Sequence, residues 1–242
     1  MNLDDASRNW TALGEDDPMW VVLTDPDKKG NRWKEEEFFA TGRAEIEGMF
    51  ERLRAVGLSP ASGQALDFGC GVGRLTQALV ARFDSVDGVD ISASMLRHAE
   101  KYNRFPGRVT YHLNIRSDLV TFPTGQYDFI CTMIALQHTP PRFQRRYLAD
   151  FLRLLKPGGC AYFQTIHARG WRQLVPHWSA DLVRKWRSRG RAFIPLYGLP
   201  VHQVRRIFEQ PGGRIVTLDS TGYAGWESRY TTDLFIVQKT TK

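Results

Sequence analysis

The stretch A-L-D-F-G-C-G-V-G-R-L-T, residues 65–76, decides the fold. A short apolar run carries the acid Asp67, three glycines follow at alternate positions, and a helical pattern begins at Arg74. Glycine adopts positive φ and lets a ligand approach the backbone closely, and a helix N-terminus offers free N–H groups. We therefore expect a strand at 65–68, a ligand-binding loop at 69–73 and a helix at 74–83.

The same alternation of strand and helix continues to residue 167. The expected strands are 85–90, 108–113, 127–133 and 160–166; the expected helices are 93–102, capped by Ser92, and one that opens after Thr139 as N-cap and stops at K-P-G-G, residues 156–159. Strands that alternate with helices through short connections indicate a mostly parallel, doubly wound α/β sheet. Ligands bind such sheets beyond the carboxyl ends of the strands.

The rest of the chain flanks this core, residues 64–167, within one domain. Residues 1–57 are expected to form an N-terminal helical lid, with helices near 4–12, 18–23 and 34–57. Residues 168–198 are a basic, aromatic insertion. Residues 199–242 are expected to hold a helix at 200–209 and two closing strands at 213–219 and 231–238.

Composition limits the class of protein. The 242 residues are 42% hydrophobic and carry a net charge of +7, which indicates a globular protein and allows an anionic partner. No secretory signal or membrane-spanning run stands out. Three cysteines at no metal-like spacing, Cys70, Cys131 and Cys160, predict reduced thiols, no metal site and a cytoplasmic location.

Two cofactor classes compete for the glycine loop. A dinucleotide fingerprint reads G-x-G-x-x-G/A, whereas this loop reads G-x-G-x-G and has the bulky Arg74 at the sixth position. Asp67 would repel a pyrophosphate but would favour an ammonium or sulfonium group. Asp90, at the end of the second strand, suits ribose hydroxyls in either class.

At this point the sequence resembles a family. The segments L-D-F-G-C-G-V-G-R-L-T, G-V-D-I-S, Y-D-F-I-C-T-M-I-A-L-Q-H and L-K-P-G-G look like the ordered motifs of class I (Rossmann-like) S-adenosylmethionine-dependent methyltransferases. The resemblance implies S-adenosyl-L-methionine as cofactor, S-adenosyl-L-homocysteine as product, and seven strands in the order 3-2-1-4-5-7-6 with the last strand antiparallel.

The resemblance also implies cofactor contacts. Asp67 and the glycine loop would hold the methionine and ribose, Asp90 both ribose hydroxyls, and Ile91 one face of the adenine. The complete set of expected cofactor residues is Asp67, Phe68, Gly69, Cys70, Gly71, Gly73, Arg74, Leu75, Asp90, Ile91, Met95, Asn114, Ile115, Arg116, Met133 and Ile134. A tight turn at the glycines, a capping role for Asp90, and core packing of Phe68 and Leu75 are the structural alternatives.

Two histidines follow strands at the expected crevice and are the candidate general bases. Transfer of a methyl group to a hydroxyl or ammonium requires loss of a proton, which His138 or His167 could accept. His138 could instead bond the loop backbone, and His167 could instead have a structural role.

The insertion carries seven basic residues and one acid between 168 and 191, with tryptophans interleaved. We expect a helical cap that binds an anionic or sugar-like acceptor; the candidate residues are Trp171, His177, Trp178 and Tyr197. A solvated helix with inward-packed tryptophans is the alternative.

The sequence thus predicts methyl transfer to a small molecule, O- rather than N-methylation, in specialised-metabolite or glycan biosynthesis. An RNA methyltransferase that uses the basic cap is the first alternative. A noncatalytic cofactor-binding protein and a nicotinamide (NAD-dependent) oxidoreductase are the others.

Overall fold

The computed structural model describes residues 2–168, 192–209, 212–221 and 230–241. Contacts divide the chain into two compact units. The first unit comprises residues 2–115 and 127–129, and the second comprises the described parts of 116–126 and 130–242. Each unit is described below by itself.

One seven-stranded sheet runs through the chain in the order β3-β2-β1-β4-β5-β7-β6. Strands β1 and β2 pair in parallel, as do β2 and β3, whereas β7 is antiparallel to both β5 and β6. The expected doubly wound, mostly parallel sheet with its antiparallel last strand is therefore confirmed.

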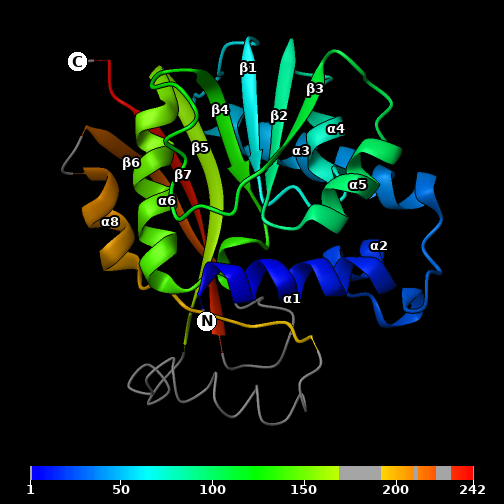
Figure 1. Cartoon of the computed structure of the whole chain (residues 1–242). Coiled ribbons are helices and arrows are strands. Elements are labelled where there is room, and N and C mark those ends of the chain that lie inside the picture. Colours follow the sequence, from blue (N-terminus) through cyan, green and yellow to red (C-terminus); the bar gives the residue numbers. More distant parts are fainter. Residues whose placement is uncertain (1, 169–191, 210–211, 222–229, 242) are drawn as a thin grey trace. The chain divides into compact units, whose positions relative to one another are not determined.

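The first unit contains the N-terminal helices and the first strands of the sheet (Figure 1). Its elements are α1 (Leu3–Asp16), α2 (Pro18–Val22), the 3-10 turn η1 (Pro26–Lys28), α3 (Glu35–Ala55), β1 (Gln64–Phe68), α4 (Arg74–Leu79), β2 (Ser85–Asp90), α5 (Ala93–Lys101), β3 (Val109–Leu113) and the start of β4 (Tyr127–Thr132).

Local chemistry explains these boundaries. The Ser92 side chain accepts a hydrogen bond from the Met95 N–H, as expected for the N-cap of α5. Helix α4 is shorter than expected and ends at Leu79, four residues before the expected end. The rings of Phe50, Phe83 and Phe129 lie with centroids 5.3–5.9 Å apart and form an aromatic core of this unit.

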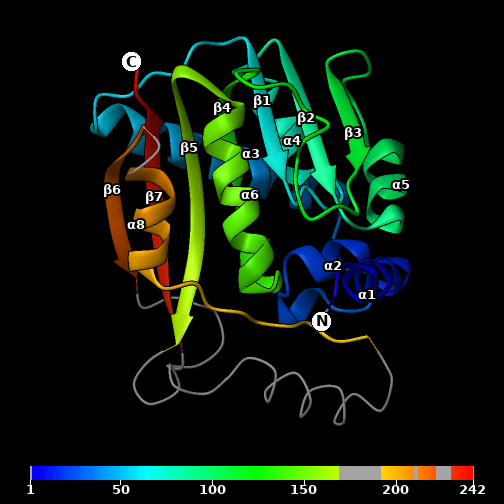
Figure 2. The same ribbon diagram turned by 60° about the vertical axis from the view of Figure 1, so that its left-hand side comes forward.

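The second unit carries the last strands, with α6 and α8 against one face of them (Figure 2). Its elements are the end of β4, η2 (Leu136–His138), α6 (Pro141–Leu154), β5 (Leu155–Ala168), α8 (Val201–Glu209), β6 (Gly213–Thr221) and β7 (Tyr230–Lys239). Phe163 stacks between Phe208 and Phe235, with centroid distances of 5.4 and 5.1 Å, and so joins α8 to the strands.

Two expected boundaries of α6 are wrong. Thr139 closes η2, and the N-cap of α6 is Pro140, because Pro141 occupies the first helical turn. The K-P-G-G segment belongs to β5, which begins at Leu155 directly after the helix. Its antiparallel pairing with β7 starts only at Cys160, so the proline and glycines precede the paired part of the strand.

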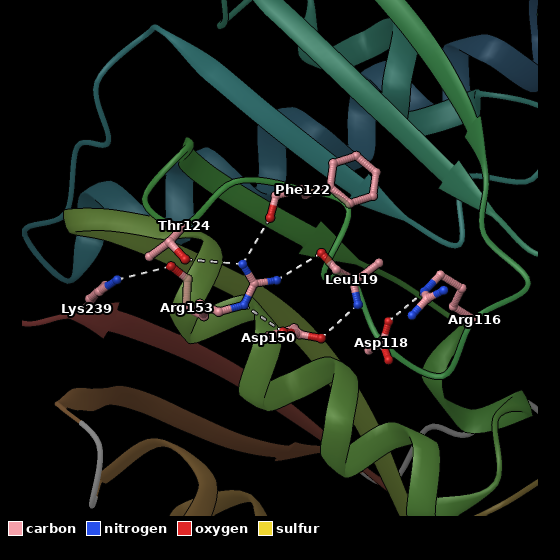
Figure 3. A network of polar contacts seen from close by, with 8 residues as sticks. All are labelled: Arg116, Asp118, Leu119, Phe122, Thr124, Asp150, Arg153 and Lys239. Carbon is pink, nitrogen blue, oxygen red and sulfur yellow. Dashed lines mark hydrogen bonds and ion pairs between the residues drawn. The ribbon is translucent and has the colours of Figure 1, made fainter.

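Arg153 ties the segment 116–126 to the end of α6 (Figure 3). Its guanidinium donates to the main-chain oxygens of Leu119 and Phe122 at 2.9 and 3.0 Å, and to Thr124 Oγ1 at 3.3 Å. Asp150 accepts from Arg153 Nε at 2.8 Å and also from the Leu119 N–H at 2.8 Å. One arginine therefore satisfies much of the polar backbone of this segment.

Candidate functional site

The glycine loop has the positive φ angles that its sequence predicts. Gly69, Gly71 and Gly73 have φ values of 75°, 54° and 82°. A Cβ atom at Gly73 would stand 2.1 Å from the Tyr111 hydroxyl oxygen, and one at Gly71 would stand 2.9 Å from a Val22 methyl. Both the backbone conformation and the close neighbours therefore exclude side chains here.

Asp67 lies buried beneath this loop with 2% of its surface exposed. Its Oδ2 accepts a 2.7 Å hydrogen bond from the Thr76 hydroxyl of α4. Burial raises the pKa of Asp67 to about 6, although Thr76 and the charge of Arg74 act in the opposite direction. A carboxylate held ionised in such a place makes the region favourable for a cation.

Asp90 joins the end of β2 to the glycine loop. Its Oδ2 accepts from the Gly71 N–H at 2.9 Å and its Oδ1 from the Ser92 N–H at 2.8 Å. Burial raises the pKa of Asp90 above its usual value. A carboxylate oxygen can accept more than one hydrogen bond, so both oxygens can also accept from ligand hydroxyls. This arrangement fits the expected ribose contact, which stays a prediction.

The N-terminal helices cover these loops in the first unit. Figure 1 shows α1 passing beneath the arrowheads of β1 and β2. The Ser7 hydroxyl donates to the Ile91 main-chain oxygen at 3.0 Å, and the Ser94 hydroxyl to that of Thr11 at 2.7 Å. A Cβ atom at Gly71 would meet Val22 of α2. The role of the N-terminal helices as a lid stays a prediction.

Most of the other expected cofactor residues of the first unit are buried, and one is exposed to solvent. Met95 packs in a cluster of buried side chains that includes Met19, Phe38 and Val72. The remaining buried residues of the set are Phe68, Cys70, Arg74, Leu75 and Asn114. By contrast Ile115 is 53% exposed. Burial of Phe68, Leu75 and Met95 favours packing, and their cofactor contacts stay predictions.

The loop after β4 holds a strained residue in the second unit. Ile134 has φ 65°, which is unfavourable for a β-branched side chain. Such outliers persist where the surroundings impose them and concentrate at functional sites. Met133 precedes it and is partly exposed. Both belong to the expected cofactor set, and their cofactor contacts stay predictions. Arg116, also of the expected cofactor set, pairs with Asp118, from Nε to Oδ1 at 3.0 Å, and its cofactor contact stays a prediction.

His138 is held by its own loop. Its Nδ1 lies 2.6 Å from the Pro195 carbonyl oxygen, and because a carbonyl only accepts, Nδ1 carries the proton. Nε2 lies 3.3 Å from Gln137 Nε2. Burial lowers the pKa of His138 to about 4, which makes it a weak base at neutral pH. These contacts favour the structural alternative for His138.

His167 has the geometry of an oriented base. Its Nδ1 lies 2.5 Å from Asp233 Oδ2, so Nδ1 carries a proton, and in the neutral ring Nε2 then carries the lone pair. The Ser220 hydroxyl donates to the other carboxylate oxygen of Asp233 at 2.6 Å. Asp233 is completely buried, whereas 28% of the His167 side chain is exposed. Among the described residues, His167 Nε2 has no hydrogen-bond partner.

The sequence reasoning missed Asp233 and Ser220. Asp233 lies opposite Thr165 in the antiparallel register, so it is a diagonal neighbour of His167 on the same face. Ser220 lies opposite Asp233 on β6. The one sequence signal was an acid within the apolar strand T-T-D-L-F-I-V, residues 231–237, because a buried charge in a strand requires partners.

The expected acceptor residues are only partly described. Trp171, His177 and Trp178 lie outside the described residues. Tyr197 is 1% exposed; its N–H donates to the Gln137 carbonyl at 2.7 Å, and its carbonyl accepts from Gln144 Nε2 at 3.2 Å. Its burial favours packing, and its acceptor role stays a prediction.

The comparisons with known proteins agree with this geometry. Residues 65–159 match the family described as "Methyltransferase domain". A ubiquinone biosynthesis O-methyltransferase of Thiobacillus denitrificans is 32% identical over 142 residues, which are 57% of this chain and 60% of that protein. A protein of the same name from Methylococcus capsulatus is 34% identical over 110 residues, 45% of this chain and 46% of that protein. The chain thus spans less than two thirds of these relatives.

A solved structure extends the likeness to nearly the whole chain. The magnesium protoporphyrin IX methyltransferase of Synechocystis PCC 6803, with bound SAH, has a TM-score of 0.64 to this structure and 17% identity; the match covers 98% of this chain and 99% of that one. At this identity the likeness establishes the fold.

Fold, glycine loop and strand order together define a Rossmann-like methyltransferase domain. Residues 65–159 match a methyltransferase domain, and the chain is similar to the class I S-adenosylmethionine-dependent methyltransferases, as the sequence motifs indicate. S-adenosylmethionine is accordingly confirmed as the cofactor of its class. The residues present fit that group, because the Asp90 carboxylate lies at the glycine loop, where its oxygens can accept further hydrogen bonds. Of the helices that the structure describes, none is both long and apolar enough to cross a membrane.

Proposed function

We propose that this protein methylates a hydroxyl group of a small-molecule acceptor, with His167 as the general base. The single observation that carries the proposal is the chain of contacts from Ser220 to Asp233 to His167. The curated relatives are named O-methyltransferases, which supports oxygen as the acceptor atom. The specialised-metabolite or glycan setting expected from the sequence has no structural observation behind it, so the proposal names only the acceptor's hydroxyl group.

In this proposal His167, Asp233 and Ser220 act together to remove the proton of the acceptor hydroxyl. S-adenosylmethionine supplies an activated methyl group, so the protein need only align the acceptor, exclude water and accept a proton. His167 Nε2 takes the hydroxyl proton while Nδ1–H stays bound to Asp233. The imidazolium that results is stabilised by the buried Asp233 carboxylate, which Ser220 holds in place. General-base catalysis of this kind contributes about 10²–10⁴-fold.

For the cofactor, Asp90 and the bare backbone of Gly71 and Gly73 would hold the ribose and methionine parts, and the ionised Asp67 would favour the positive charge. These roles remain part of the proposal.

The test is transfer of a deuterated methyl group. The protein is incubated with methyl-deuterated S-adenosylmethionine and a metabolite extract, and products with a heavy methyl on oxygen are identified by mass spectrometry. Loss of turnover by about 10²–10⁴-fold in His167→Ala, with unchanged S-adenosylhomocysteine affinity, is the expected result. His202→Ala is the matched control, because His202 is an exposed histidine at the start of α8.

Asp233→Asn should also lower turnover, because an amide does not stabilise an imidazolium as a carboxylate does. Normal turnover in His167→Ala would refute the assignment of the base. Heavy methyl found only in RNA would refute a small-molecule acceptor and favour the RNA alternative.

A further inference from the structure

Three neighbouring strands of the first unit place one residue each in a single row of the sheet. Asp67 of β1 lies opposite Gly88 of β2, and Gly88 lies opposite Tyr111 of β3. Directly opposite residues of parallel strands point to the same face of a sheet, so Tyr111 shares the face on which Asp67 bonds Thr76 of α4. Because Gly88 carries no side chain, the middle position of the row is open.

The Tyr111 ring fills this open position. A Cβ atom at Gly88 would stand 2.7 Å from Tyr111 Cδ1 and 2.8 Å from Cε1. The backbone of Gly88 does not require glycine, because its φ lies outside the positive range. The close approach of the Tyr111 ring is therefore the reason that residue 88 has no side chain.

The far end of the Tyr111 side chain reaches the glycine loop. A Cβ atom at Gly73 would stand 2.1 Å from the hydroxyl oxygen and 2.9 Å from Cζ of Tyr111. Gly73 is the N-cap of α4; its N–H donates to the Cys70 carbonyl at 2.9 Å, and its carbonyl accepts from the Gln77 N–H at 3.1 Å. Tyr111 thus contacts the residue at which the loop ends and the helix begins.

The Tyr111 hydroxyl serves no hydrogen bond that would explain it. Among the described residues it is buried and has no hydrogen-bond partner. Burial raises the pKa of Tyr111 above its usual value, and the acidic groups of Cys70 and Asp67 act in the same direction. A buried hydroxyl without a partner destabilises a fold, so packing of the ring alone would favour phenylalanine. What tyrosine adds at this position is the oxygen atom against Gly73.

We propose that Tyr111 is a positioning residue of the cofactor site, which holds the glycine loop in place at Gly73. Its ring crosses β2 where Gly88 leaves room, and its hydroxyl oxygen supports the backbone of Gly73 from the side on which other residues carry a side chain. The inference rests on the proposed cofactor contacts of the glycine loop. Tyr111 is outside the set of residues that the sequence motifs indicate for the cofactor.

This role has a consequence for affinity. A loop that is held in one conformation before its ligand arrives loses less conformational freedom on binding, and a supporting residue that packs against it provides this. Without the hydroxyl oxygen, Gly73 loses its contact on one side, and the cofactor must order the loop on binding. The affinity for the cofactor should therefore fall, whereas the rest of the fold has no need of this atom.

The test compares Tyr111→Phe with the unchanged protein, because this substitution removes only the oxygen against Gly73. Calorimetry measures the affinities for S-adenosylmethionine and S-adenosylhomocysteine, and urea unfolding measures stability. Both affinities should fall by about fivefold or more, whereas the free energy of unfolding should not fall, because an unpaired buried hydroxyl is removed. Hydrogen exchange in residues 69–77 of the cofactor-free protein should become faster.

Tyr127→Phe is the matched control. It also removes one tyrosine hydroxyl from this unit, but that hydroxyl donates to the buried Asp87 at 2.7 Å. Asp87 precedes Gly88 in β2, so its side chain lies on the opposite face of the sheet. This variant should show the reverse pattern, with lower stability and unchanged affinities.

A second pair of variants tests the contact across β2. Gly88→Ala places a methyl group against the Tyr111 ring and should weaken both affinities. In Tyr111→Ala, which has no ring, the further change Gly88→Ala should have little effect, since the two residues act through one contact.

Unchanged affinities in Tyr111→Phe would overturn the inference, and so would a loss of affinity accompanied by the loss of stability seen in Tyr127→Phe. A loss confined to S-adenosylmethionine would overturn the assignment to the loop, because it would indicate an effect on the charge of Asp67. If the unchanged protein bound neither compound, the proposed cofactor site itself would be refuted.

Discussion

Replacement of Asp67 by asparagine should make the protein more stable at neutral pH while it weakens cofactor binding. The side chain is buried, and its pKa is raised from 3.8 to about 6, chiefly by burial. An acid whose folded pKa lies above its unfolded pKa loses stability as pH rises through that interval. Ionised Asp67 is therefore a cost to folding at pH 7.5, and asparagine removes that cost.

The magnitude follows from the shift. Two pKa units correspond to about 3 kcal/mol at pH 7.5. The same reasoning leaves less than about 1 kcal/mol at pH 4, where the carboxyl is protonated in the folded state and roughly half protonated in the unfolded state. Asparagine keeps an acceptor for the Thr76 hydroxyl but with a weaker, uncharged bond, which offsets about 1 kcal/mol. The expected net gain is about 1–2 kcal/mol at pH 7.5 and near zero at pH 4.

Urea unfolding at pH 7.5 and pH 4 measures the stability, and calorimetry at pH 7.5 measures the affinity for S-adenosylmethionine. The affinity should fall, because a negative charge near the positively charged methionine part is lost. Asp87→Asn is the matched control. Asp87 is a buried acid of β2 that accepts from Gln64 and Tyr127 at 2.9 and 2.7 Å, so its replacement should destabilise the fold.

Destabilisation of Asp67→Asn at pH 7.5, similar to that of the Asp87 control, would refute the reasoning and give Asp67 a structural role. Higher stability with unchanged cofactor affinity would refute only the electrostatic role toward the cofactor.

Two further predictions concern the second unit. Ile134→Gly should raise the free energy of unfolding by about 0.5–1 kcal/mol, because glycine relieves the positive φ; a loss above about 1 kcal/mol in urea unfolding would contradict this. Arg153→Lys should lower it by about 2 kcal/mol and speed hydrogen exchange in residues 116–126, because lysine cannot replace the several bonds of the guanidinium. Arg145→Lys is the exposed control; equal effects of the two would contradict the role of Arg153.

The sequence by itself determined the features that depend on residues within a few positions of one another. The boundaries of β2, Ser85–Asp90, agree with the expected 85–90, because the buried strand ends just before Ser92, which caps the next helix. The positive φ values of the glycine loop could be predicted too, because glycine adopts positive φ and three glycines lie at alternate positions there. The resemblance then supplied the strand order, which the structure confirms.

Sequence reasoning was less successful at the ends of elements. The end of α4 at Leu79 and the start of β5 at Leu155 depend on how each segment meets its neighbours. A helix pattern continues in the sequence beyond the point where packing ends the helix, and a proline and two glycines lie in β5 ahead of its pairing with β7.

Only the tertiary structure decided which polar residues work together. His167 and Asp233 are 66 residues apart in the chain, and the register of β5 with β7 brings them to 2.5 Å. His138 was an equal candidate in the sequence, but the Pro195 carbonyl and burial make it a weak base. The physical reason is that propensity and capping act over a few residues, whereas burial, pKa and the partners of a buried charge are set by segments distant in sequence.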